Sequence, residues 1–186
     1  MLLSPANLGG RRGQLLTNPK ADFALARQLR GAGGAPLGDV FSFVSGLYFR
    51  GKLRYARAFA RAPTGVPGCY VMTAGGGLCT PEEAVTLERI RGWSAVSIHE
   101  DNPHFTAPLL RHAAALLDTS DATTRFVLLG SVARNKYIEP LLEVFGERLL
   151  FPRDFLGLGD MSRGSLLLSA VREQRELDYR RVKPNR

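Results

Sequence analysis

Asp160, Ser162 and Arg163 stand together immediately before the last apolar segment of the chain, in the stretch GDMSRGSLLL. An aspartate or serine at such a junction caps a helix, because its side-chain oxygen accepts a hydrogen bond from the first helical N–H groups. An arginine beside it can hold an anion with its forked guanidinium. Since a helix cap explains one polar residue and not three, the junction is a candidate site for a negatively charged ligand.

Two glycine-rich segments are further candidates for an anion site, since glycine lets a ligand come close to the backbone. The first, residues 7–13 (NLGGRRG), offers three polar side chains on a turn: Asn7, Arg11 and Arg12. It lacks the Lys-Ser/Thr ending of a P-loop and the spacing of a dinucleotide fingerprint, so a mobile basic loop is the alternative. In the second, residues 74–81 (AGGGLCTP), N–H groups at Gly75 and Gly76 could line an anion-binding nest, or the glycines could serve a turn with positive φ.

A third candidate segment, residues 130–137 (GSVARNKY), follows an apolar run and begins a predicted helix. Its first turn would present four polar side chains at the end of the strand: Ser131, Arg134, Asn135 and Lys136. Asn135 and Lys136 could hold a phosphate or the edge of a base there. A capping Ser131 and a solvent-exposed helix face would explain the same residues.

Four arginines form one stripe along the predicted helix 49–61. They recur at intervals of four, three and four residues: Arg50, Arg54, Arg57 and Arg61. The apolar residues of this helix recur one position earlier, so the stripe lies beside its buried face. Because no acid is interleaved, neighbouring arginines repel one another by about 0.2–0.5 kcal/mol per pair unless a polyanion is bound. The stripe therefore indicates either contact with nucleic acid or another polyanion, or a face that serves solubility.

The stretch HEDNPHF, residues 99–105, gathers two histidines and two acids. A metal site or an acid–base pair is one interpretation, and a cap for the next helix is the more ordinary one. No second Cys/His set completes a zinc site, and the chain has neither a nucleophile elbow nor an H-E-x-x-H motif. We therefore expect no metal ion and no cofactor, and Glu100 and Asp160 are only weak candidates for a catalytic carboxylate.

The composition places these residues on one compact, basic domain. The chain has 186 residues, of which 45% are hydrophobic and 23% charged, enough to bury a sizeable core. Its formal net charge is +8. Residues 1–61 contain ten Lys or Arg and two acids, whereas residues 62–186 contain fifteen of each. The whole cationic excess therefore sits in the first third of the chain, as a protein that binds polyanions would carry it.

The cysteines and the absence of long apolar runs favour a cytoplasmic protein. Cys69 and Cys79 have the spacing of neither a metal-ligand pair nor a disulfide framework, which indicates a reducing compartment. The apolar run at the start is too short for a secretory signal, and nothing approaches the roughly 18 apolar residues of a membrane span. We expect no membrane partner, and the sequence leaves the oligomeric state open.

Short apolar runs alternate with loops and segments of helical spacing, which predicts an α/β domain with a mostly parallel central sheet flanked by helices, over residues 1–186. The expected strands are Met1–Ala6, Cys69–Ala74, Ser94–His99, Arg125–Gly130 and Arg148–Pro152. The expected helices are Asp22–Leu29, Phe49–Arg61, Pro81–Arg91, Phe105–Leu117, Val132–Phe145 and Arg163–Glu176. Near-continuous apolar strands indicate a sheet covered on both faces, with its ligand-binding loops at the carboxyl ends of the strands.

Loop chemistry supports several of these boundaries. Thr80, followed by proline and two acids, predicts the start of the helix 81–91. Gly146 is expected as the left-handed residue that ends the helix 132–145. Pro140 inside that helix predicts a kink or a late start. Residues 182–186 are expected to fray.

At these loops the chain resembles the YaaA family, also called the peroxide stress or peroxide resistance family. The start MLLSPA resembles that family's N-terminal strand, and LGDVFSFVSGLYFRG contains Gly-Asp-Val and Ser-Gly-Leu-Tyr like those found there. SVARNKYIEPL resembles its Ala-Ser-Asn-Glu-Tyr segment, and RLLFPRDF with GDMSRGSLL resembles its last strand, acidic loop and final helix. The motifs keep their order from residue 1 to about 175.

The resemblance implies an α/β domain with a basic cleft that binds double-stranded DNA, in proteins tied to protection of DNA during oxidative stress. Six residues would line that cleft by the same resemblance: Ser4, Tyr48, Asn135, Tyr137, Ser162 and Arg163. Position 136 is Lys where the family often has Glu. Similar domains also occur beside base-exchanging tRNA and DNA enzymes, which keeps a nucleoside-handling activity open.

Our leading prediction is a nucleic-acid-binding domain, with DNA as the expected ligand. In this interpretation the arginine stripe, Arg11 and Arg12 grip phosphates, and the strand-end loops receive a nucleotide. The alternative is an enzyme that acts on a nucleoside or nucleotide, such as an N-glycosidase or a base transferase, with Asp160 or Glu100 as its carboxylate. A third alternative is an accessory protein whose basic face meets an acidic protein.

Overall fold

Within residues 1–132 and 135–184, which the computed structural model describes, a six-stranded sheet runs through the middle of the molecule in the order β4-β3-β1-β6-β7-β8. Its four inner strands are parallel: β1 (Leu2–Leu3), β3 (Tyr70–Thr73), β6 (Phe126–Leu129) and β7 (Leu149–Pro152). Two antiparallel strands close the edges: β4 (Gly77–Cys79) and β8 (Tyr179–Arg181). The predicted α/β fold with a mostly parallel sheet is confirmed.

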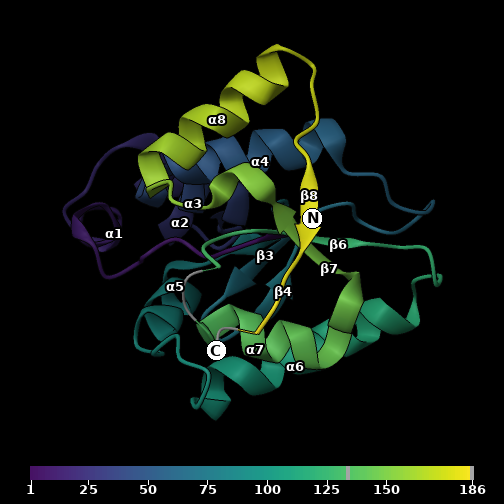
Figure 1. Cartoon of the computed structure of the whole chain (residues 1–186). Helices are drawn as coiled ribbons and strands as arrows, with labels where there is room; N and C mark the ends of the chain where they lie inside the picture. Colours follow the sequence, from purple (N-terminus) through teal and green to yellow (C-terminus); the bar gives the residue numbers. More distant parts are fainter. Residues whose placement is uncertain (133–134, 185–186) are drawn as a thin grey trace.

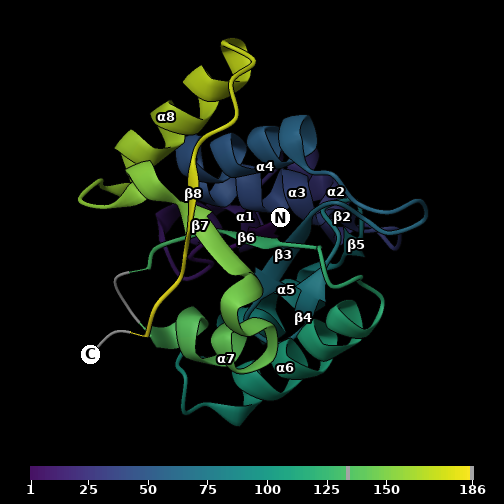
Figure 2. The same cartoon turned by 45° about the vertical axis from the view of Figure 1, so that its right-hand side comes forward.

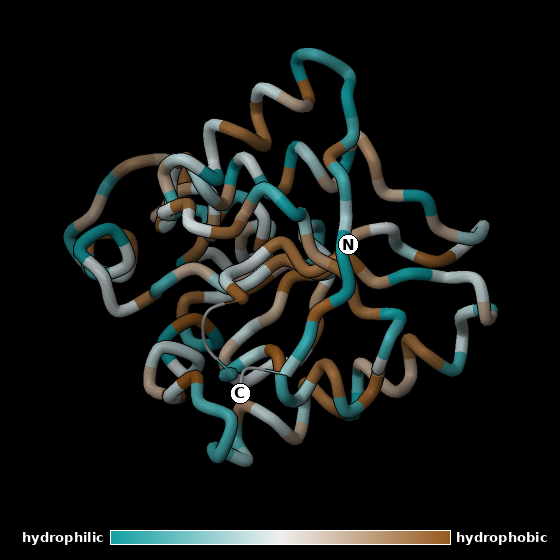
Figure 3. The backbone as a smooth tube through the Cα atoms, viewed as in Figure 1, coloured by the Kyte–Doolittle hydropathy of each residue, from teal (hydrophilic) through white to brown (hydrophobic). Residues whose placement is uncertain are grey.

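Helices cover both faces of the sheet, so the molecule has three layers (Figures 1 and 2). One layer holds α1 (Arg11–Thr17), α2 (Ala24–Arg30), α3 (Leu37–Ser45), α4 (Leu47–Phe59) and α8 (Asp160–Arg172). The other holds α5 (Leu87–Ser94), α6 (Pro103–Asp118) and α7 (Asn135–Phe145). The central strands are the apolar interior of this arrangement (Figure 3), and Leu2 and Leu3 of β1 are fully buried.

Four of the five predicted strands are present, and Ser94–His99 is not one of them. Ser94 ends α5, and the residues that follow it are exposed or half-buried, so they have no second layer to cover them. The strands β4 and β8 were not predicted. Each pairs antiparallel with a predicted strand, β4 through the tight turn after β3 and β8 along the outer side of β7.

The predicted start of a helix at Thr80 is wrong, because the following residues pair with another segment instead. The N–H groups of Gly38 and Leu37 donate to the carbonyls of Pro81 (2.8 Å) and Glu83 (2.9 Å). A small ribbon continues this pairing, between β2 (Ala35–Pro36) and β5 (Ala84–Val85). The helix α5 begins later, where the Thr86 side chain accepts from the Arg89 N–H (3.3 Å).

Other boundaries agree in part with the sequence. Gly146 has a φ of +51° at the end of α7, as expected for a left-handed terminal residue. α7 begins at Asn135 rather than at 132, and Pro140 lies inside it. The chain was expected to fray from residue 182, but Val182 is buried and its N–H donates to the Leu149 carbonyl (3.0 Å). The helices α1 and α3 were not predicted.

A close crossing of α4 and α8 builds the layer above β1. A Cβ atom added to Gly51 would lie 2.8 Å from the Gly164 carbonyl oxygen, and one added to Gly164 would lie 2.9 Å from the Tyr48 Cα. Real Cβ atoms do not approach backbone so closely, so both positions require glycine. The crossing sets the N-terminal residues of α8 against the first turns of α4, which is where the candidate site lies.

Candidate functional site

A cavity of about 850 Å³ opens at the carboxyl ends of β1 and β6. The chain leaves β1 for β3 on one side, while β6 lies on the other side, so this is the point where the strand order reverses. Open α/β sheets bind their ligands at such a point. The polar lining from the loops and from the starts of α1 and α7 comprises Ser4, Asn7, Arg11, Arg12, Ser131 and Lys136.

The charged side chains that line the cavity are mostly cationic. Among the described residues they are Arg11, Arg12 and Lys136 against the single carboxylate of Asp160. Arg12 also donates to the Phe43 carbonyl at 3.3 Å, and the Lys136 Nζ lies 4.8 Å from the centre of the Tyr137 ring. Both contacts hold a positive charge at the edge of the cavity. The site is therefore suited to a ligand with negative charge.

Ser4 follows β1 directly and contacts the one fully buried lysine in the described part of the chain. The Lys52 Nζ donates to the Ser4 carbonyl oxygen at 2.6 Å and lies 2.9 Å from the Ser4 Oγ. Lys52 is 1% exposed, whereas Ser4 belongs to the cavity wall. The hydroxyl of a serine in the cavity wall is thus hydrogen-bonded to an amine that solvent does not reach.

The surroundings of Lys52 disfavour its charged form. Burial lowers the pKa of Lys52 to about 7, and the Asp160 carboxylate opposes that shift only in part. The Nζ lies 4.5 Å from the Tyr48 ring centre and 5.0 Å from the Phe49 ring centre, so aromatic faces supply weak compensation. Near neutral pH the amine is present in both its neutral and its charged form.

Tyr48 brings a second buried polar group to the cavity. It lies in the first turn of α4 and lines the cavity, and its hydroxyl has no hydrogen-bond partner among the described residues. Burial raises the pKa of Tyr48 to about 12, and the nearby Arg163 guanidinium opposes the shift. The phenol therefore keeps its proton. Its oxygen is fully buried and makes no hydrogen bond of ordinary geometry in the described structure, and the Arg163 guanidinium is the charged donor beside it.

The start of α8 differs from its prediction. Gly159 is the N-cap residue and makes no side-chain cap, so neither Asp160 nor Ser162 serves as one. Arg163 is buried rather than aimed into the cavity: its Nε donates to the Phe155 carbonyl (3.2 Å), and its guanidinium pairs with Asp160 (3.4 Å). Arg163 thus fixes the loop before α8 and positions Asp160, which does line the cavity. Ser162 is exposed on the helix surface outside the cavity.

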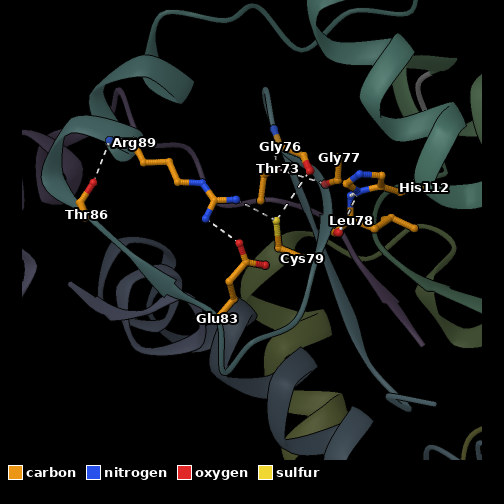
Figure 4. Close-up of polar contacts among 9 residues, drawn as sticks. All are labelled: Thr73, Gly76, Gly77, Leu78, Cys79, Glu83, Thr86, Arg89 and His112. Atoms are coloured by element: carbon orange, nitrogen blue, oxygen red, sulfur yellow. Dashed lines mark hydrogen bonds and ion pairs between the residues drawn. The ribbon is translucent and has the colours of Figure 1, made fainter. Parts of the chain in front are cut away.

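The glycine turn after β3 is a hairpin and not an anion nest (Figure 4). The Gly76 N–H already donates to the Thr73 Oγ1 at 2.9 Å. A Cβ atom added to Gly75 or Gly76 would lie 3.0 Å or 2.6 Å from the Trp93 ring, and Gly77 has a φ of +68°. Gly77 therefore serves a turn with positive φ, which was the alternative interpretation, whereas Gly75 and Gly76 allow close packing against Trp93 of α5. Neither Gly75 nor Gly76 lines the cavity.

Three arginines of the stripe lie on the exposed side of α4, Arg61 follows the end of that helix, and none of the four lines the cavity. α4 starts at the cavity with Tyr48, and the stripe runs away from it: Arg61 lines depressions near Met1 and Arg125, at the opposite end of the strands. Two members have acidic partners from distant segments, Arg57 with Glu82 (2.9 Å) and Arg61 with Glu176 (3.3 Å). The other two, Arg50 and Arg54, are exposed.

The remaining predicted residues divide between the cavity and its surroundings. Tyr137 lines the cavity with Lys136, whereas the Asn135 side chain donates to the Glu139 carboxylate. Glu100 does not line the cavity and lies near His99, whose Nδ1 is 3.8 Å from the carboxylate. Asn102 caps α6 by accepting from the His104 N–H (3.1 Å), which confirms the capping interpretation of that loop. Arg134 lies outside the described residues.

Sequence reasoning missed Lys52, Val96 and Ile98. Lys52 was given no role from the sequence, although it stands four residues after Tyr48 and four before Ala56, on the buried side of α4. A lysine within the apolar row of a helix is a signal that could have singled it out. Val96 and Ile98 line the cavity from the segment that was expected to be a strand.

No group of three or more His, Cys, Asp or Glu residues that could hold a metal ion occurs in the described part of the chain. Within the same residues, no helix is both long and apolar enough to cross a membrane. Comparisons of the sequence with protein-family models and curated proteins, and of the structure with solved structures, give no match.

Proposed function

We propose that the protein binds nucleic acid, with DNA as the expected form, and that one nucleotide unit of the ligand occupies the cavity. The observation that carries this proposal is the placement of three cationic side chains around a cavity at the reversal point of the sheet. At about 850 Å³ the cavity falls in the size range of ligand sites, roughly 300–1,000 Å³, and has room for a nucleotide.

The lining offers a partner to each part of a nucleotide. Arg11, Arg12 and Lys136 can neutralise a phosphate, and arginine pairs with phosphate oxygens through two parallel hydrogen bonds. Val96, Ile98 and the Tyr137 ring supply apolar surface for a sugar or a base. The Tyr48 hydroxyl is a donor without a partner in the described structure. The combination favours a nucleotide over a bare inorganic anion.

A binding titration tests the proposal. Labelled single-stranded DNA, duplex DNA, RNA and thymidine 5′-monophosphate are titrated at several salt concentrations. Because each phosphate contact releases counterions, affinity should fall steeply with salt. The double variant Arg11→Ala/Arg12→Ala should lose about tenfold or more in affinity and about two units of the logarithmic salt slope for DNA.

Arg111→Ala is the matched control, because Arg111 is exposed on α6 outside the cavity. It removes one positive charge from the other layer, whereas the double variant removes two from the cavity, and it should leave binding close to wild type. Equal losses in the control and the cavity variant would show only an effect of net charge. Absence of binding to every nucleotide probe at low salt would overturn the proposal.

A second candidate function is an enzyme that acts on a nucleoside or nucleotide, as an N-glycosidase or base transferase does. Asp160 favours it, since this carboxylate lines the cavity and is held by the buried Arg163. A carboxylate there could stabilise positive charge on a sugar as its base leaves. Release of free base from nucleosides or DNA, lost in Asp160→Asn, would establish this activity.

The cellular part of the proposal follows from the resemblance to the YaaA family: protection of DNA under oxidative stress, in the cytoplasm. The two cysteines are free and buried, which agrees with a reducing compartment. A strain that lacks the protein should survive hydrogen peroxide less well, and the Arg11→Ala/Arg12→Ala variant should not restore survival. Full restoration by that variant would separate stress protection from the cavity.

A further inference from the structure

We propose that Ser4 is a nucleophile and Lys52 its general base, and that the pair cleaves a phosphate ester bound in the cavity. This inference rests on the proposed function, because it needs a phosphate-bearing ligand at the cations of the cavity. It adds a chemical step that binding does not require.

The geometry places one reactive oxygen between the amine and the ligand. The Lys52 Nζ is within hydrogen-bond distance of both the Ser4 Oγ (2.9 Å) and the Ser4 carbonyl oxygen (2.6 Å). A neutral amine can donate one N–H to the carbonyl and still accept the hydroxyl proton with its lone pair. Serine needs such an adjacent base to act as a nucleophile, and the required distance is about 2.6–3.2 Å.

The backbone holds Ser4 rigidly at the cavity wall. Its N–H donates to the Leu129 carbonyl at 3.1 Å, which continues the pairing of β1 with β6. A Cβ atom added to Gly130 would lie 2.8 Å from the Ser4 Cβ, so the neighbouring strand end needs glycine where it packs against the serine. Reactive groups on strand ends are held more precisely than groups on loops.

Three elements set the charge state of Lys52. β1 contributes the two oxygens of Ser4, α4 contributes the ring of Tyr48, and α8 contributes the Asp160 carboxylate, the charged group that favours the ammonium form. Burial outweighs that carboxylate and lowers the pKa of Lys52 to about 7. A lysine tuned in this way can take a proton near neutral pH, as a general base must.

The cavity lining favours phosphorus over an acyl carbon as the centre under attack. Serine with a lysine base is suited to either reaction, but an acyl group carries no charge for Arg11, Arg12 and Lys136 to meet. A phosphate diester carries a negative charge, and cations are the groups that stabilise a transferring phosphoryl group.

The reaction balances with water as the only added reactant. The Ser4 Oγ forms a bond to phosphorus, the bond from phosphorus to the leaving oxygen breaks, and the serine proton passes to the Lys52 Nζ. That proton leaves with the alcohol, so the lysine is neutral again. Water then attacks the phosphoserine diester, which releases the second product and returns the proton to Ser4.

The experiment separates this step from ligand binding. The full-length protein is given thymidine 5′-monophosphate p-nitrophenyl ester, and release of p-nitrophenolate is followed while calorimetry measures binding of thymidine 5′-monophosphate. We expect release by the wild type and a loss of about 100-fold or more in Ser4→Ala and Lys52→Met. Acid quenching should trap the nucleotide on the peptide that contains Ser4. Ser165→Ala, an exposed serine of α8, is the matched control and should keep the full rate.

The pH profile distinguishes a base from a lysine that only supports the strand end. The rate should rise as the pH passes through about 7, where Lys52 loses its proton. Ser4→Ala keeps the Lys52 bond to the Ser4 carbonyl, so it tests the nucleophile even if Lys52→Met fails to fold.

Binding without release of p-nitrophenolate, or an undiminished rate in Ser4→Ala, would overturn the inference and leave the proposed function standing. Ser4-dependent cleavage of p-nitrophenyl acetate with no cleavage of the phosphodiester would also overturn it, in favour of acyl chemistry. Absence of nucleotide binding would instead contradict the proposed function.

Discussion

At Lys52, burial and hydrogen bonding act in opposite directions. The side chain loses its contact with water, which disfavours the ammonium, and it gains two oxygens of Ser4 and the faces of two aromatic rings. A buried lysine of this kind costs stability that a methionine of similar size would not. This loss of stability is explained by the proposed role of the amine as a base at the cavity.

The first prediction concerns the pH dependence of folding. The pKa of Lys52 is about 7 in the folded protein and 10.5 for a free lysine. Between these values the unfolded chain binds up to one more proton than the folded chain, so stability should rise with pH by roughly 1 kcal/mol per unit. Urea unfolding between pH 7 and 9 should show this rise, and Lys52→Met should lose it.

Other groups whose pKa changes on folding limit the pH range in which the effect of Lys52 can be measured. Burial also lowers the pKa of the Met1 amino group, so part of the rise should persist in the variant. Burial raises the pKa of Cys69 and Cys79 from 9.0 to about 11, which reverses the trend above pH 9, because the unfolded thiols lose their protons first. A stability of Lys52→Met that follows the wild type at every pH would show that Lys52 keeps an ordinary pKa.

The second prediction compares two buried tyrosines. Tyr48→Phe removes a hydroxyl without a partner in the described structure, so the free protein should be unchanged or more stable by up to about 1 kcal/mol. The same variant should bind the nucleotide less tightly, since Tyr48 is part of the cavity wall. Urea unfolding and calorimetry measure the two effects.

Tyr55→Phe is the control for that experiment. The Tyr55 hydroxyl bonds to the Tyr179 hydroxyl at 2.7 Å and accepts from the Leu177 N–H at 2.8 Å. Its removal leaves the Leu177 N–H unpaired, while the Tyr179 hydroxyl keeps its bond to Glu176 (2.8 Å), and should cost about 1–3 kcal/mol. If Tyr48→Phe is as destabilising as Tyr55→Phe, the Tyr48 hydroxyl has a structural partner within the protein and is not a ligand-binding group.

Among the elements, the crossing of α4 and α8 decides whether the site forms. It sets Tyr48 and Lys52 of one helix against Asp160 and Arg163 of the other, and it depends on glycine at positions 51 and 164. The third prediction is that Gly51→Ala destabilises the protein by about 1–3 kcal/mol, as overpacking does, although alanine is the better helix former. Thermal unfolding measures the change.

Gly92→Ala provides the matched comparison within a helix. Gly92 lies inside α5, and a Cβ atom there meets nothing within 4 Å. The substitution should therefore stabilise the protein by about 0.5–1 kcal/mol through helix propensity alone. A similar effect of both substitutions would mean that α4 can move away from α8 at little cost.

The sequence predicts the inner strands well because each is a short apolar run that must be covered on both faces. It does not predict the edges, since β4 and β8 form by pairing with strands far away or across a tight turn. Thr80 shows the same limit. Its local pattern is that of a helix start, but the chain there bonds to the start of α3, and tertiary pairing prevails over local preference.

The sequence predicts which loops line the candidate site, but not the direction of each side chain in them. The strand-end rule brings Asn7, Arg11, Arg12 and Lys136 to one cavity, as expected, and Ser4, which the resemblance implied, lines the same cavity. It does not tell which way a side chain turns. Arg163 faces inward to the Phe155 carbonyl, and the glycines after β3 face Trp93, because packing partners from distant segments decide both.

On the scale of the whole molecule, the positive charge belongs largely to one layer. Residues 1–61, which hold the cationic excess, form β1 and the helices α1 to α4. Arg11 and Arg12 of this layer reach the cavity, while the arginine stripe continues along α4 toward the opposite end of the strands. A long polyanion could therefore contact both regions, whereas a mononucleotide could contact only the cavity.

The fourth prediction uses this separation to tell nucleic acid from free nucleotide. Arg50→Ala/Arg54→Ala should reduce the salt slope for duplex DNA by about two, because these exposed arginines are available to phosphates. Arg57→Ala/Arg61→Ala removes the same charge but should reduce the slope less, since Glu82 and Glu176 already offset those arginines. Neither double variant should change the affinity for thymidine 5′-monophosphate. An unchanged duplex slope in both would assign the stripe to solubility and restrict the ligand to what the cavity alone can hold.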